Sequence, residues 1–253
     1  MELSIFPLSD HESQCGYFPD RKFISEHFYS SEYSEEHLEV LLARGYRHFG
    51  TYFFRPVCGI CTRCIPLRVP VGRYHFSKSA RRILNKNRDL QTDMTIPSLQ
   101  EEAFSLYMEH KRRFGETGNE SREIFAESFF SHTSGAKQLS MYLMDKLVGI
   151  SHFDETEHCL SAVYTYYSGG FPERSLGAFA VLQLLRLGME KNKDYVYLGY
   201  YIEENRHMQY KARYYPNEIS TTDDIWIPFM NERNECVNPK ALYRGFSPFQ
   251  RLF

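Results

Sequence analysis

The stretch Cys159-Leu160-Ser161-Ala162-Val163-Tyr164-Thr165-Tyr166-Tyr167 decides the fold. Its β-branched and aromatic residues predict a strand in the middle of the chain. Two further strand-like runs, Gln138–Met144 and Leu147–Phe153, precede it and are separated only by Asp145-Lys146. A two-residue connection joins antiparallel neighbours, so the three runs predict an antiparallel meander.

A helix and a fourth strand follow the meander. Residues 175–191 have helical periodicity, and Tyr195–Leu198 is again strand-like. The apolar residues on or near one face of this helix are Phe179, Leu182, Leu185 and Met189. Three antiparallel strands, a helix and a further strand are typical of the core of a GCN5-related N-acyltransferase. The sequence therefore predicts an α+β protein with a GCN5-related N-acyltransferase-like C-terminal domain.

Helices are also predicted before this core. Ser34 is a suitable N-cap and Gly45 a suitable stop for the first of them. A capping-box pattern at Ser98 and Glu101 begins a second helix, which we expect to end at Gly115.

The first part of the chain is predicted to be a smaller domain. The domain boundary is expected near residue 95. Beyond it, a short helix is expected from about residue 121 to 130. Residues 1–95 would then form a basic, cysteine-containing N-terminal domain, and residues 96–253 the acyltransferase-like domain.

Composition excludes several classes of protein. Of the 253 residues, 42% are hydrophobic and 25% are charged, which is enough to bury one large core or two modest ones. The formal net charge of −2 excludes a globally basic nucleic-acid binder. No run approaches the roughly 18 apolar residues of a membrane span. Met1–Phe18 carries Glu2 and Asp10 and does not look like a signal peptide. We therefore expect a cytoplasmic protein with no membrane partner and with reduced cysteines.

Positive charge is concentrated in one stretch. Arg55 to Arg88 contains nine Lys or Arg residues and no Asp or Glu. Such residues neutralise phosphates, and Tyr74 and Phe76 could stack on unpaired bases. The alternative is a solvated helix face with scattered arginines.

The cysteines form the motif Cys58-x-x-Cys61-x-x-Cys64, with Cys15 upstream. Thiolates at this spacing can share a zinc ion or an iron–sulfur cluster. A zinc ribbon would have a second such pair, which the chain lacks. Plain reduced cysteines packed in a small fold remain the alternative.

Two segments after the meander carry candidate reactive groups. Arg174-Ser175-Leu176-Gly177 lies between a strand and a helix, where backbone N–H groups can face an acyl donor. Phe179 would crowd the pyrophosphate of coenzyme A at this loop. The tyrosine-rich run 197–202 and Met208-Gln209-Tyr210-Lys211 could orient an amine, relay a proton or bind a carboxylate.

These motifs together resemble the arginyl-tRNA-protein transferase family, and within it the bacterial aspartate/glutamate leucyltransferases. The segments that carry the resemblance are 15–17, 52–71, 77–82 with Asn87, 161–167, 174–177, 197–202, 208–211 and 215–216. The resemblance implies transfer of leucine from leucyl-tRNA to the N-terminal amine of proteins beginning with Asp or Glu, which marks them for degradation through the N-degron pathway. Arginyl-tRNA is the alternative donor. No cofactor is required for this chemistry, because the aminoacyl ester is already activated.

The resemblance and the residue chemistry together nominate a site. The expected catalytic residues are Tyr201, Tyr210 and Lys211. The expected substrate-binding residues are Arg174, Ser175, Leu176, Gly177, Tyr166 and Met208, and the expected tRNA-binding residues are Arg73, Lys78, Arg81, Arg82 and Lys86. Arg174 and Lys211 would recognise the acidic N-terminal residue. The leucine pocket would be lined by Phe179, Tyr166 and Met208, whereas Glu173, Glu203 and Glu204 would suit arginine.

Two other functions compete with the transferase. A coenzyme A-dependent N-acetyltransferase would share the fold. A non-enzymatic, metal-dependent RNA-binding module would use the basic stretch and the cysteines alone. Incubation with charged tRNA and a peptide beginning with Asp separates these classes.

Overall fold

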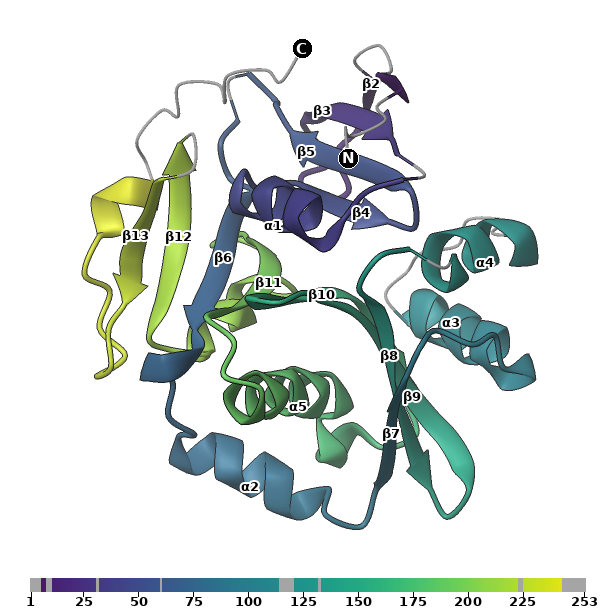
Figure 1. The fold of residues 1–253 in the computed structure, drawn as a ribbon. Coiled ribbons are helices and arrows are strands. Elements are labelled where there is room, and N and C mark those ends of the chain that lie inside the picture. Colours follow the sequence, from purple (N-terminus) through teal and green to yellow (C-terminus); the bar gives the residue numbers. More distant parts are fainter. Residues whose placement is uncertain are drawn as a thin grey trace.

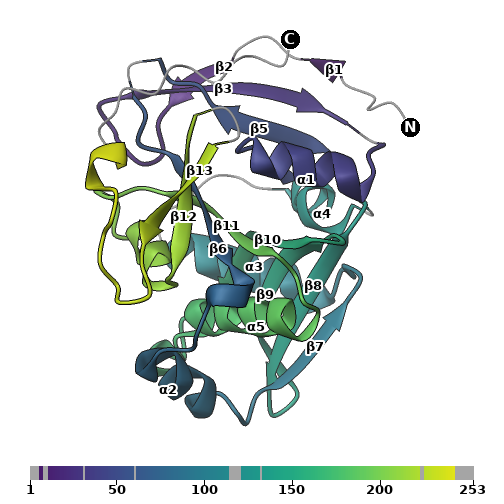
Figure 2. The ribbon, with the colours of Figure 1, turned by 60° about the vertical axis from the view of Figure 1, so that its left-hand side comes forward.

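The computed structural model describes residues 6–7, 11–30, 32–59, 61–113, 121–131, 133–222 and 225–242. Two β-sheets organise this part of the chain, a small one near the N-terminus and a large one that contains the rest. Figures 1 and 2 show the small sheet and its helix stacked on one end of the large sheet.

The small sheet has the strand order β1-β3-β5-β4, with β2 also paired to β3. Its elements are β1 (Phe6–Pro7), β2 (His11–Gln14), β3 (Lys22–Tyr29), α1 (Glu35–Ala43), β4 (Arg47–Phe49) and β5 (Tyr52–Pro56). Ser34 caps α1 and forms a reciprocal capping box with His37. The core of this layer reaches Cys159 and Tyr197, so the small sheet packs directly onto the large one.

The large sheet has eight strands in the order β13-β12-β6-β11-β10-β9-β8-β7. Their bounds are β6 (Ile65–Pro70), β7 (Gln91–Thr95), β8 (Ala136–Leu143), β9 (Lys146–Glu155), β10 (Cys159–Tyr167), β11 (Tyr195–Tyr201), β12 (Asn217–Thr222) and β13 (Ile225–Met230). Neighbours are antiparallel except β10 and β11, which are parallel because α5 crosses between them.

Helices cover both faces of the large sheet (Figure 1). The α-helices are α2 (Lys78–Lys86), α3 (Glu101–Arg113), α4 (Arg122–Phe130) and α5 (Leu176–Glu190). The short 3₁₀ helices are η1 (Val71–Arg73), η2 (Pro172–Arg174), η3 (Gln209–Arg213) and η4 (Pro239–Leu242). The helix α5 lies on one face with α2 against it, whereas α3 and α4 lie on the opposite face.

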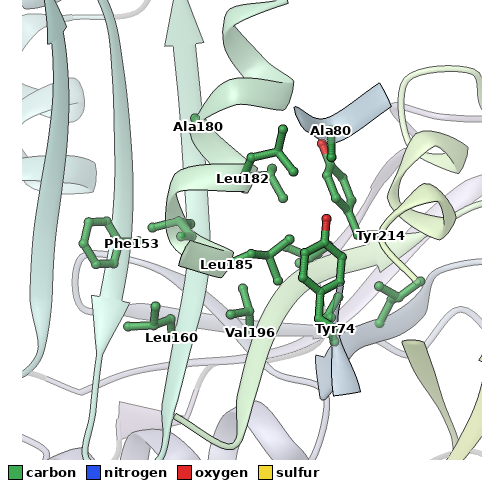
Figure 3. Close-up of a cluster of buried hydrophobic side chains, with 14 of the residues drawn as sticks. Tyr74, Ala80, Phe153, Leu160, Ala180, Leu182, Leu185, Val196 and Tyr214 are labelled. Atoms are coloured by element: carbon green, nitrogen blue, oxygen red, sulfur yellow. The ribbon is translucent and has the colours of Figure 1, made fainter. Parts of the chain in front are cut away.

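The main core lies between α5 and the sheet (Figure 3). Leu182 and Leu185 of α5 point toward Leu160 and Val196 on the central strands. All four side chains are at most 1% exposed. Burying a leucine of this kind contributes roughly 1.5 to 3 kcal/mol, so this contact fixes the position of α5 and of the loop before it.

The predicted meander, crossover helix and fourth strand are confirmed. The strands β8, β9 and β10 pair antiparallel in sequence order, and Met144 and Asp145 adopt positive φ at the tight turn between β8 and β9. The helices predicted from the Ser34, Ser98 and Ser121 signals are also present as α1, α3 and α4. The predicted stop at Gly115 lies outside the described residues. The fold is thus a mixed α/β protein with sheets, in which the N-terminal part forms the smaller layer.

The predicted boundary at residue 95 does not coincide with the division between the sheets. The strands β6 and β7 and the helix α2 precede residue 95, yet β6 pairs with β11, β7 pairs with β8, and α2 packs on α5. Long-range pairing of β6 with a strand some 130 residues later carries this segment into the large sheet. The small sheet ends with β5, well before residue 95.

Among the helices of the described residues, we find none with the length and apolar character needed to cross a membrane.

Candidate functional site

The central parallel strands separate at their C-terminal ends. The strands β10 and β11 pair only from Cys159↔Tyr195 to Ser161↔Tyr197, although β10 continues to Tyr167 and β11 to Tyr201. The register of β11 against β6 also shifts between Tyr197 and Tyr200. Gly199 lies in this bulge with φ +78°, a left-handed conformation that glycine adopts without strain. Tyr197 and Tyr200 consequently face the small sheet together.

Lys211 is buried beside this bulge. It belongs to η3 and is 8% exposed, and its Nζ donates a 2.7 Å hydrogen bond to the carbonyl oxygen of Tyr200. Burial, together with the positive charge of Arg47, lowers the pKa of Lys211 from 10.5 to about 7. The amine can therefore exchange a proton near neutral pH.

Arg47 reaches the same place from β4 and was not predicted as a site residue. It is 7% exposed, and its guanidinium lies over the rings of Tyr197 and Tyr200, at 5.5 and 5.6 Å from their centroids. A methyl group at Gly199 would lie 3.5 Å from Lys211 Nζ and 3.9 Å from Arg47 Nε. The two cationic side chains therefore converge on the bulge.

The predicted tyrosines divide between two surroundings. Tyr201 faces the main core, where its ring lies 5.2 Å from that of Phe229. Tyr200, which was not predicted, instead faces Arg47 and donates a 2.8 Å hydrogen bond to the Gly45 carbonyl. Tyr210 precedes Lys211 on η3, and burial raises its pKa to about 12, so its phenol stays protonated. Of the three predicted catalytic residues, Tyr201 and Tyr210 both pack with the main core, whereas Lys211 faces the Gly199 bulge.

The loop before α5 contains four of the predicted substrate-binding residues. Arg174 forms a bidentate ion pair with Asp89, at 2.8 and 2.9 Å, and does not face Lys211. Ser175 is the N-cap residue of α5 in a left-handed conformation, and Leu176 is 1% exposed in the main core. Gly177 lies against Tyr167, since a methyl group there would be 2.9 Å from Tyr167 Cε1.

The predicted leucine pocket does not form. Tyr166 lies among the aromatic residues of α3 and α4 and contacts His152 through its hydroxyl at 3.2 Å. Phe179 is buried under α5 on the opposite face of the sheet. Strand alternation and helix packing thus separate these two side chains. Met208 does lie at the site, with its Sδ 3.7 Å from Lys211 Nζ.

Part of the basic stretch is neutralised by distant carboxylates. Arg55, Arg63, Arg68 and Arg73 pair with Glu26, Glu204, Glu218 and Glu232, respectively. The predicted tRNA contact Arg73 is therefore already engaged. The remaining cations of the stretch are exposed on or just after α2 and form no ion pair with a described residue: Lys78, Arg81, Arg82, Lys86 and Arg88.

A surface pocket adjoins these exposed cations between α2 and α5. Arg81 lines it from α2, and Arg186, which was not predicted, lines it from α5. Both arginines are exposed, and neither pairs with a described carboxylate. His75 and Phe76 complete a wall that combines positive charge with an aromatic ring. The amide of Asn87 connects this helix to the α5 loop by a 2.8 Å hydrogen bond to the Arg174 carbonyl.

The four N-terminal cysteines, Cys15, Cys58, Cys61 and Cys64, line a single pocket. The other lining residues are Phe18, Lys22, Phe23, Pro56, Val57, Gly59, Thr62, Pro66 and Ser220. No carboxylate contributes to this largely apolar wall. Cys64 is close enough to Lys211 to affect its pKa, so the pocket adjoins the candidate site.

The arrangement of these thiols does not match a metal centre. Among the described residues, no three or more His, Cys, Asp or Glu side chains are placed to hold one metal ion. Cys58 Sγ lies 3.4 Å from both the N and O atoms of Ile24, and Cys61 Sγ accepts a hydrogen bond from Arg21. Burial also raises the pKa values of Cys58 and Cys64, which favours thiols over thiolates.

Comparison with known proteins agrees with this geometry. The family description "Arginine-tRNA-protein transferase, N terminus" matches residues 13–82, and "Arginine-tRNA-protein transferase, C terminus" matches residues 102–221. The chain is 35% identical over 217 residues to an aspartate/glutamate leucyltransferase of Campylobacter jejuni, covering 82% of this chain and 90% of that protein. The corresponding protein of Marinobacter nauticus is 33% identical over 228 residues, covering 88% and 95%.

The solved structures are more distant. A crystal structure of FemX superposes with a TM-score of 0.49 and 8% identity, covering 78% of this chain and 69% of that one. Sequence relationship, by contrast, extends across both sheets and the candidate site. The chain is an aminoacyltransferase that belongs to the arginine-tRNA-protein transferase family.

Proposed function

We propose that this protein transfers leucine from leucyl-tRNA to the N-terminal amine of proteins that begin with Asp or Glu, as a step of the N-degron pathway. The observation that carries this proposal is the 35% identity to an aspartate/glutamate leucyltransferase, which extends over 90% of that relative. The buried lysine at the diverging strands gives the reaction a physical centre.

In the proposed reaction the neutral α-amine attacks the ester carbonyl of leucyl-tRNA. A C–N bond forms, the C–O bond to the terminal ribose breaks, and the ribose hydroxyl takes up a proton. Lys211, whose pKa is about 7, is suited to accept the proton that the amine loses. Tyr210, the preceding residue in the chain, keeps its phenol protonated, and we assign to it the hydrogen bond to the carbonyl oxygen as charge develops there.

We place the tRNA along α2. Its exposed cations suit the phosphate backbone, and the pocket with Arg186 and Phe76 suits a nucleotide with a stacked base. The hydrogen bond from Asn87 to Arg174 joins the end of α2 to the loop that begins α5. The charged end of the tRNA would follow this connection toward Gly177 and Tyr210.

The cysteine pocket favours leucine as the amino acid transferred. It lies against Lys211 through Cys64, and its described wall is mostly apolar. Among the described lining residues the charged one is Lys22, which is paired with Glu12, so this wall offers no carboxylate to hold a guanidinium. Glu204, one of the carboxylates that would suit arginine, is engaged by Arg63 at 2.6 Å.

Three finer assignments accompany the proposal. We assign the core to the GCN5-related N-acyltransferase type, an assignment supported by the diverging parallel strands and the crossover helix α5. The reaction needs no metal or organic cofactor, since the donor ester supplies the driving force. The donor is charged tRNA, which places the enzyme in the cytoplasm.

A transfer assay tests the proposal. Purified protein is incubated with leucyl-tRNA carrying radiolabelled leucine and with matched peptides that begin with Asp, Glu, Asn or Ala. Label should enter the Asp and Glu peptides only. Parallel reactions with arginyl-tRNA and with acetyl-coenzyme A measure the two competing enzymatic functions. Absence of transfer from leucyl-tRNA, with transfer from either competitor, would refute the proposed donor.

A further inference from the structure

The interface between the two sheets holds buried positive charge without a matching carboxylate. The buried Arg and Lys residues of the described chain are Arg47, Arg55 and Lys211. Arg55 donates a 2.7 Å hydrogen bond to Glu26 and is compensated. Arg47 and Lys211 form no ion pair with a described carboxylate.

The carboxylate that influences Arg47 does not neutralise its buried charge. Asp154 contributes to the electrostatic surroundings of Arg47, but its Oδ2 accepts a 2.9 Å hydrogen bond from His48 Nε2. On Arg47 itself, Nη1 donates to the carbonyl of Tyr46, whereas Nε and Nη2 have no hydrogen-bond partner among the described residues. The rings of Tyr197 and Tyr200 attract the charge but cannot satisfy these N–H donors.

A buried guanidinium with unused donors is costly unless an anion completes it. The unused Nε and the Lys211 amine both point to Gly199, where no side chain intervenes. Burial lowers the pKa of Arg47, but an arginine guanidinium keeps its proton in proteins. It is therefore suited to hold a carboxylate in a fixed, planar geometry.

We propose that Arg47 is the specificity-determining residue that binds the side-chain carboxylate of the acceptor's N-terminal Asp or Glu. This inference rests on the proposed function and assigns the acceptor subsite within it. The carboxylate would accept hydrogen bonds from Nε and Nη2 of Arg47 beside the Gly199 bulge, with the α-amine directed to Lys211. An Asn or Gln side chain brings N–H groups toward these donors and is rejected.

If Arg47 binds substrate, its replacement should lower activity on acidic peptides without lowering the melting temperature. Replacement of a purely structural arginine should lower the melting temperature. Arg47→Met retains most of the side-chain length and removes a charge that carries two unused donors, Nε and Nη2. We expect its melting temperature to equal or exceed that of the wild type. Its kcat/KM for Asp and Glu peptides should fall roughly tenfold to a hundredfold, mainly through KM, because a charge-assisted contact is lost. Arg47→Lys should recover part of this loss.

Arg55→Met is the matched control, since Arg55 is equally buried but paired. It should lower the melting temperature by leaving Glu26 uncompensated, without changing the ratio of activity on Asp and Asn peptides. Binding is measured separately, without tRNA, as the rise in melting temperature that an Asp peptide causes relative to an Asn peptide. This rise should occur with the wild type and be absent with Arg47→Met.

The outcomes distinguish the inference from the function on which it rests. If the wild type transfers leucine to Asp peptides but Arg47→Met keeps the same Asp-to-Asn ratio and the same peptide-induced stabilisation, Arg47 is not the specificity residue. If the wild type transfers nothing to Asp peptides, the proposed function fails. Should Arg47→Met fold poorly, the Asp-to-Asn ratio of Arg47→Lys decides, because a ratio does not depend on the amount of active protein.

Discussion

Replacement of Lys211 by Met should stabilise the protein, and by an amount that depends on pH. Burial lowers the pKa of Lys211 from 10.5 to about 7 in the folded state, whereas an unfolded lysine titrates near 10.4. Between these values the unfolded chain binds one more proton, so wild-type stability rises as pH increases from about 7. Below about pH 7 the folded wild type carries the full desolvation cost of the charged amine.

The magnitude follows from the size of this pKa difference. At about 1.4 kcal/mol per pH unit, the charge costs on the order of 4 kcal/mol in acid. The substitution also removes the hydrogen bond to the Tyr200 carbonyl, a loss of roughly 1 kcal/mol that does not depend on pH. Lys211→Met should therefore gain on the order of 3 kcal/mol at about pH 6, and this gain should shrink by roughly 2 to 3 kcal/mol by about pH 9.

Urea unfolding of both proteins across this pH range measures the difference. Lys146→Met, at the exposed turn between β8 and β9, is the control and should show no pH-dependent difference from the wild type. If the stability difference between Lys211→Met and the wild type is the same in acid and in alkali, Lys211 does not titrate near neutrality. It would then be unsuited to accept the proton in the transfer reaction.

Three further substitutions test other parts of the structure. Asp154→Asn removes the negative charge from the buried 2.9 Å contact with His48 and should cost about 3 kcal/mol in thermal unfolding. Burial lowers the His48 pKa, but Asp154 outweighs it and raises that pKa, so the loss should be largest in acid and smaller above the His48 pKa. An unchanged melting temperature would contradict the assignment. The double change Arg81→Ala with Arg82→Ala should reduce the salt-dependence slope of tRNA binding by about 2. An equal reduction with the exposed residues Arg122 and Lys146 changed to Ala would show a non-specific effect. Thr62→Trp should fill the cysteine pocket and raise KM for leucyl-tRNA, but leave the affinity for uncharged tRNA unchanged; a normal KM would exclude this pocket as the leucine site.

The central part of the fold could be predicted because its signals are local. The runs that became β8, β9 and β10 contain their own strand periodicity and a two-residue turn, and α5 has a continuous apolar face. By contrast, β6 begins with Ile65-Pro66 and ends at Pro70, and prolines argue against a central strand. Its place between β11 and β12 depends on partners far away in the sequence. For the same reason, the sequence did not show that β6 belongs to the large sheet although it precedes residue 95.

The site was predictable to the extent that its residues lie in recognisable motifs. Lys211 and Tyr210 were nominated in this way, and their catalytic roles stay predictions. Arg47 was not, because it lies in a short strand of the small sheet and becomes significant only when Gly199, some 150 residues later, folds against it. Arg174 illustrates the opposite error, since the sequence gives no sign that Asp89 neutralises it. Net charge along a segment does not reveal which cations remain unpaired after folding.

Fragmentation mass spectrometry of the acceptor peptide tests the central claim most directly. A peptide beginning with Asp is incubated with the protein and an equimolar mixture of leucyl-tRNA and arginyl-tRNA, and the modified position is read from the fragments. The account predicts one leucyl residue on the α-amine of the Asp peptide and no addition to a peptide beginning with Asn. Arginine on the α-amine, or leucine on the Asn peptide, would contradict it.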